Sequence, residues 1–171
     1  MSFPLIRELF HHMSSAGYCT ARFNFRGVGQ STGVSGDGTG EMEDLRSVCE
    51  FMLQTYPAIE KILLIGYSFG AAISVAMINQ HPAICGIVAI SPPFEMLGEF
   101  FQITAVTKPK FFIIGSQDDF TSEKNFTNAV AEFPPPKASL VVPDENHFWY
   151  GREAYLCEKI LEWVQFTFPN P

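Results

Sequence analysis

The sequence predicts an α/β fold with a mainly parallel sheet, because strand-like and helix-like segments alternate along the chain. Five short runs rich in apolar, β-branched and aromatic residues alternate along the chain with segments of helical periodicity. Strands that alternate with helices in this way form βαβ units, whose strands run parallel. In such sheets, functional residues collect at the carboxyl ends of the strands.

The N-terminal part of the chain predicts a helix, a strand and a second helix. Apolar residues recur at helical spacing over residues 4–16, and Gly17 ends that segment. Residues 18–25 (YCTARFNF) carry the aromatic and β-branched side chains that are typical of a strand. A glycine-rich loop follows, and residues 40–55 again show helical spacing.

The rest of the chain predicts four strands and three helices. Short apolar runs bounded by glycine or proline indicate the strands, and apolar repeats at helical spacing indicate the helices. Thr121 or Ser122 is expected to cap the helix that begins near residue 122. The predicted strands are 61–66, 84–90, 110–115 and 138–142, and the predicted helices are 69–80, 122–132 and 152–166.

The composition predicts one globular domain over residues 1–171, since 47% of the residues are hydrophobic and 17% are charged. The net charge of −7 and the scattered lysines and arginines give no electrostatic support for nucleic-acid binding. The four cysteines lie far apart, which favours free thiols in a reducing compartment. No apolar run reaches the roughly 18 residues of a membrane span, so we expect a cytoplasmic protein.

The segment Lys61–Gly70 (KILLIGYSFG) carries the strongest motif of the chain. Ser68 lies between Gly66 and Gly70, after an apolar strand and before a helix. A serine on so sharp a turn has a strained backbone and exposes its hydroxyl above the sheet edge. Glycine at both flanking positions is expected to remove side chains that would collide where strand and helix approach. This pattern predicts Ser68 as a catalytic nucleophile.

Two further strand ends carry the residue types that activate a serine. Asp118 and Asp119 follow the predicted strand at 110–115, and His147 follows the last strand. An imidazole can take the serine proton, and a carboxylate can fix the imidazole tautomer and stabilise the imidazolium. The alternatives are a serine that only caps a helix, a loop histidine bonded to backbone, and aspartates that only form a turn.

The chain order serine, aspartate, histidine is that of the α/β-hydrolases, and the whole chain resembles the small, lidless members of that family. The resemblance implies a three-layer α/β-hydrolase fold, with Ser68 as nucleophile, His147 as base and Asp118 as acid. Asp119 is the alternate acid, because the spacing from the preceding glycine favours Asp118 without excluding its neighbour. The segments that carry the resemblance are Arg22–Gly33, Gly66–Gly70, Gly115–Asp118 and Glu145–Gly151.

The sequence departs from this family at its beginning. Family members start with two or three more strands, and the loop after the third supplies a backbone N–H to the oxyanion hole. This chain starts at the helix after that loop, so we expect an N-terminally truncated fold that lacks the first strands. The N–H of Phe69 then provides one oxyanion donor, and no second donor is identified. Losing one such donor typically costs roughly 10²–10³ in rate.

Two functions from different classes follow. The first is a serine hydrolase of the carboxylesterase or thioesterase type, which cleaves small acyl substrates through an acyl-enzyme and uses water as its second substrate. Peptidase activity is an option within this class. The alternative is a catalytically impaired hydrolase-fold protein that acts as a binding or regulatory module.

No cofactor or metal is expected. Gly27 and Gly29 are followed by Gly33, one position too late for the dinucleotide-binding pattern G-x-G-x-x-G. The expected partner is a small-molecule acyl substrate. An exposed edge on the strand at 18–25 or at 61–66 would also permit a homodimer, which is a hypothesis at this point.

Overall fold

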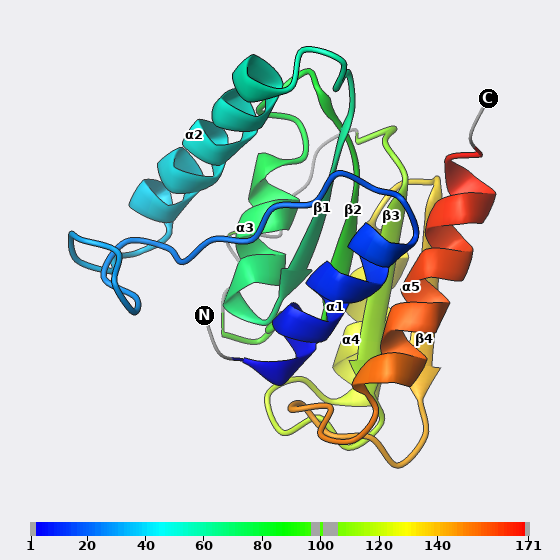
Figure 1. Ribbon diagram of the computed structural model, residues 1–171. Coiled ribbons are helices and arrows are strands. Elements are labelled where there is room, and N and C mark those ends of the chain that lie inside the picture. Colours follow the sequence, from blue (N-terminus) through cyan, green and yellow to red (C-terminus); the bar gives the residue numbers. More distant parts are fainter. Residues whose placement is uncertain (1–2, 97–99, 101–105, 170–171) are drawn as a thin grey trace. The chain divides into compact units, whose positions relative to one another are not determined.

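The computed structural model describes residues 3–96, 100 and 106–169 (Figure 1). The chain divides into two compact units. One unit is Gly36–His147, and the other joins Met1–Ser35 to Phe148–Pro171. The first unit contains the whole described sheet, so it is the part that positions the strand ends. The single domain predicted over residues 1–171 stays a prediction.

Four parallel strands form one sheet in the order β1-β2-β3-β4 (Figure 1). The predicted α/β class and parallel sheet are therefore confirmed, and the strand bounds differ from the predicted ones by at most one residue. β2 and β3 lie in the middle of the sheet and are almost entirely buried, which explains their continuous apolar sequences. The strands are β1 (Ile62–Tyr67), β2 (Ile84–Ile90), β3 (Lys110–Gly115) and β4 (Lys137–Val142).

Three helices belong to the same unit as the sheet: α2 (Thr39–Thr55), α3 (Phe69–Met77) and α4 (Glu123–Glu132). α3 packs against β1 and β2, and α4 packs against β3. Of the two expected caps, Ser122 performs the role, because its hydroxyl oxygen accepts a hydrogen bond from the Asn125 N–H at 3.3 Å.

The start of α2 is fixed by a buried carboxylate. The side chain of Glu41 is completely buried and accepts hydrogen bonds from the backbone N–H groups of Gly36, at 2.8 Å, and Gly38, at 3.1 Å. Burying a carboxylate is costly unless such donors satisfy it. Glu41 therefore ties the end of the glycine-rich loop to the first turn of α2.

The second unit contains α1 (Pro4–Ser15) and α5 (Glu153–Thr167), which pack against each other. The predicted strand at 18–25 is wrong, because the structure assigns no strand to these residues. An isolated extended segment needs a neighbouring strand to satisfy its backbone groups, and aromatic and β-branched composition cannot supply one. The segment instead ends in tight turns, with the Val28 N–H donating to the carbonyl of Phe25.

In the part of the chain that the structure describes, β1 pairs only with β2 and so forms an edge of the sheet. A homodimer through this edge stays a prediction.

All four cysteines lie in the part of the chain that the structure describes and are free. Burial raises the pKa of Cys157 to about 12, helped by the carboxylates of Glu8, Glu153 and Glu158. Within the same residues, no helix combines the length and the apolar character that crossing a membrane requires.

Lys110 is fully buried at the start of β3, and its ammonium group donates hydrogen bonds to two backbone carbonyls. Its Nζ donates to the backbone carbonyls of Val106, at 2.9 Å, and Lys108, at 2.7 Å. Burial lowers the pKa of Lys110 to about 8, and the positive charge of Lys137 adds to this effect. The neutral amine would keep two N–H donors for the same two carbonyls.

Replacing Lys110 by Met should change how stability depends on pH. The pKa of Lys110 is about 8 in the folded chain, against an ordinary value of 10.5. Between these values the unfolded chain binds more protons, so the stability contributed by Lys110 rises with pH. We expect the free energy of unfolding of the wild type to rise relative to K110M by up to about 3 kcal/mol over this interval. Urea unfolding at several pH values measures it, and parallel pH profiles of the two proteins would contradict it.

Candidate active site

Ser68 lies at the sharp turn between β1 and α3, with φ 51° and ψ −119°. A positive φ is uncommon for a residue other than glycine and costs on the order of 1–3 kcal/mol. The turn is held against the neighbouring strand, because the Ser68 N–H donates to the Ile90 carbonyl at 2.9 Å. The backbone strain that the motif predicts is therefore present at Ser68.

The sharpness of this turn depends on one of the two flanking glycines. A Cβ added to Gly66 would lie 2.2 Å from the carbonyl oxygen of Gly70, which is too short for a contact between non-bonded atoms. A Cβ added to Gly70 would meet no described atom within 4 Å. The expectation that both glycines relieve a collision thus holds for Gly66 and is wrong for Gly70.

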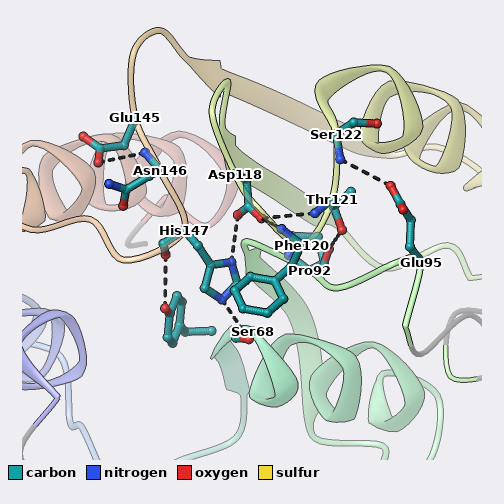
Figure 2. Close-up of polar contacts among 11 residues, drawn as sticks. Ser68, Pro92, Glu95, Asp118, Phe120, Thr121, Ser122, Glu145, Asn146 and His147 are labelled. Carbon is teal, nitrogen blue, oxygen red and sulfur yellow. Dashed lines mark hydrogen bonds and ion pairs between the residues drawn. The ribbon is translucent and has the colours of Figure 1, made fainter.

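The structure brings three of the predicted residues into one hydrogen-bonded row (Figure 2). His147 Nε2 lies 3.0 Å from Ser68 Oγ, and His147 Nδ1 lies 2.8 Å from Asp118 Oδ2. The side chains of His147 and Asp118 are only 5% and 1% exposed. With the Nδ1 proton directed at the carboxylate, Nε2 is the nitrogen that can accept the serine proton. This arrangement, a serine hydroxyl beside a base that a carboxylate orients, is typical of an activated nucleophile.

The carboxylate of Asp118 is buried but has several hydrogen-bond donors. Its Oδ1 accepts from the backbone N–H groups of Phe120, at 2.9 Å, and Thr121, at 3.2 Å. Burial alone would raise the pKa of Asp118, but hydrogen bonds from His147, Phe120 and Ser91, with the charge of His147, lower it below its ordinary value. Asp118 is therefore ionised at neutral pH and can orient His147.

Asp119 is exposed on the same turn, and the carboxylate that contacts the His147 ring belongs to Asp118.

Phe69, the predicted oxyanion donor, is the first residue of α3 and follows Ser68 directly. Its backbone N–H therefore lies at the N-terminus of a helix, where the helix dipole favours developing negative charge. Among the described residues, no group of three or more His, Cys, Asp or Glu side chains gathers as a metal site.

The loop that carries His147 is anchored to the turn that carries Asp118. The Gln117 N–H donates to the Glu145 carbonyl at 2.8 Å. A Cβ added to Gly115 would lie 2.2 Å from the same carbonyl oxygen, so only glycine allows this approach. The G-x-x-D spacing thus has a structural cause, since the glycine admits the loop that delivers the histidine.

Sequence reasoning missed two aromatic residues that lie against the imidazole. The ring centroid of Phe120 is 4.4 Å from that of His147, and the ring centroid of Tyr67 is 5.3 Å from it. Tyr67 precedes the nucleophile and Phe120 is two residues after Asp118. This adjacency was the only available signal, because nothing in a sequence shows which neighbours of a functional residue turn toward it.

The sequence profile of the family described as serine aminopeptidase, S33, matches residues 4–112. A relative, an uncharacterised protein from Rickettsia prowazekii (strain Madrid E), is 33% identical over 171 residues, covering 96% of this chain and 72% of that protein.

Solved structures are also similar. An α/β serine hydrolase homologue from Coxiella burnetii is 28% identical with a TM-score of 0.85, over 96% of this chain and 77% of that one. A lidless α/β serine hydrolase from Xanthomonas campestris has a TM-score of 0.90 at 24% identity, over 100% and 77% of the two chains, and shows the fold alone. The α/β-hydrolase fold predicted from the sequence is confirmed by these comparisons.

Replacing Gly66 by Ala should destabilise the turn that carries the serine, whereas replacing Gly70 by Ala should not. The added methyl group at position 66 collides with backbone, and such overpacking costs about 1–3 kcal/mol. At position 70 the methyl group meets open space within a helix, where alanine is favoured over glycine. Urea unfolding of the two variants measures the difference, and equal loss of stability would contradict the assigned role of Gly66.

Proposed function

The chain belongs to the serine aminopeptidase S33 family of α/β-hydrolases, and on this premise we propose that it is a serine hydrolase that cleaves small carboxylic esters or thioesters. The observation that carries the proposal is the row formed by Ser68, His147 and Asp118, with its distances of 3.0 and 2.8 Å. Both contacts lie within the hydrogen-bonding range required of a nucleophile, its base and the group that orients the base.

In the proposed reaction, Ser68 Oγ attacks the carbonyl carbon of the substrate while His147 Nε2 takes the hydroxyl proton. The ionised Asp118 stabilises the imidazolium that forms, without taking the proton itself. The backbone N–H of Phe69 donates to the oxyanion of the tetrahedral intermediate.

Collapse of the intermediate then breaks the bond to the leaving alcohol or thiol, which receives the proton from His147. A water molecule, deprotonated by the same histidine, attacks the acyl-enzyme and releases the acid. Esters and thioesters suit this site because their leaving groups depart more readily than amines do. The protein needs no cofactor for these steps, and we propose that it acts on its small acyl substrate in the cytoplasm.

The description of the family favours one second candidate, the cleavage of a peptide bond at an N-terminus. The same row of side chains would serve, with an amine as the leaving group. A matched pair of substrates with one acyl group, an aminoacyl ester and the corresponding aminoacyl anilide, separates the two. Turnover of the ester alone supports the esterase proposal, and comparable turnover of the anilide supports the peptidase.

Labelling by a fluorophosphonate probe tests whether Ser68 is activated. We expect the wild type to be labelled, S68A to remain unlabelled, and H147A to be labelled at a strongly reduced rate. D118N should lower the rate by about 10³–10⁴-fold, because the amide no longer holds the required tautomer. D119N is the matched control and should react like the wild type, since the Asp119 side chain is exposed.

A folded wild type that fails to react would contradict the proposal. The alternative, a hydrolase-fold protein with a binding or regulatory role, would then lead. Circular dichroism and urea unfolding of each variant establish that the compared chains are folded.

A further inference from the structure

Tyr67, the last residue of β1, contacts the histidine through both its ring and its hydroxyl. The hydroxyl donates a hydrogen bond to the backbone carbonyl of His147 at 3.1 Å. The ring centroids of the two residues are 5.3 Å apart, and the ring planes are inclined by 43°. Tyr67 is half-buried and immediately precedes Ser68, so one short segment carries both the serine and this contact.

The loop after β4 needs more than one anchor to place an imidazole accurately. One anchor is at Glu145, whose carbonyl accepts from the Gln117 N–H at 2.8 Å. His147 lies two residues further along, and the backbone rotations of the intervening residue can still move its ring. The Tyr67 hydroxyl supplies a second anchor, at the backbone of His147 itself.

The two anchors come from different parts of the site. Gln117 belongs to the turn that carries Asp118, whereas Tyr67 belongs to the strand that carries Ser68. The loop is therefore fixed to the acid at one residue and to the nucleophile at another. A displacement of about 1 Å between reacting groups can cost on the order of 10² in rate, so such fixation has catalytic value.

We propose that Tyr67 is a positioning residue, whose hydroxyl holds the backbone of His147. In this position Nε2 stays within hydrogen-bonding distance of Ser68 Oγ, and Nδ1 keeps its hydrogen bond to Asp118 Oδ2. The proposal rests on the proposed function, because it assigns Tyr67 a role in the same hydrolytic site. Tyr67 does not touch the reacting atoms in this role. It acts through the histidine.

The test uses the full chain and the variant Y67F, which keeps the ring and removes only the hydroxyl. The matched control is Y56F, since Tyr56 is an exposed tyrosine at the end of α2. The rate of fluorophosphonate labelling should fall by about 5–10-fold in Y67F, as expected for the loss of one hydrogen bond, and should be unchanged in Y56F. With a small ester substrate, the loss should appear in kcat and leave KM nearly constant.

A spectroscopic measurement separates positioning from a merely structural role. The proton on His147 Nδ1 that is directed at Asp118 should give a downfield proton resonance, and its exchange with water reports how firmly the ring is held. We expect faster exchange in Y67F than in the wild type and in Y56F, at a temperature where all three chains are fully folded. Equal exchange and equal labelling rates in Y67F and the wild type would overturn the proposal.

Failure of this proposal is distinguishable from failure of the proposed function. If the wild type and S68A both resist labelling, the hydrolase assignment fails. The exchange of the Nδ1 proton then still decides whether Tyr67 holds His147. If the wild type is labelled and Y67F matches it in both measurements, the hydrolase assignment stands and the role of Tyr67 is rejected.

Discussion

The candidate site depends on two places where the backbone passes itself too closely for any side chain. At Gly66, the strand meets the carbonyl of Gly70 at the start of α3, which produces the sharp turn under Ser68. At Gly115, the end of β3 meets the carbonyl of Glu145, which brings the last loop over the turn of Asp118. Each approach supplies one half of the geometry, because the first presents the serine and the second delivers the histidine.

The loop that carries His147 contacts both of the segments that these approaches shape. The strand of Ser68 holds the histidine loop through Tyr67, and the turn of Asp118 holds the same loop through Gln117. The imidazole then contacts both Ser68 and Asp118. The histidine loop is therefore held by both of the other segments, and the parallel sheet brings the carboxyl ends of their strands to one edge.

The sequence was sufficient for what local patterns determine. The four strands, the turn at Ser68 and the chain order of the three polar residues all follow from short segments with a clear periodicity or motif. The segment 18–25 shows the limit of such patterns, because a strand exists only where another strand pairs with it. The choice between Asp118 and Asp119 shows the same limit, since a local pattern does not reveal which of two neighbouring turn residues faces His147. Tyr67 carried no signal beyond its place next to Ser68, because its contact joins residues 80 positions apart.

An ionisable side chain is buried near each end of β3, and the partners of the two groups decide whether the charged form is favoured. Lys110 donates to two backbone carbonyls at the start of the strand, but these contacts leave its charge costly, and burial lowers its pKa to about 8. Asp118, beyond the other end, accepts from two backbone N–H groups and from an imidazole, and its pKa falls despite burial. The difference lies in the partners, since the hydrogen bonds to Asp118 outweigh its burial, whereas the charge of Lys137 adds to the effect of burial on Lys110. A carboxylate held in this way is ionised at neutral pH and can keep the ring of His147 oriented with Nε2 toward Ser68.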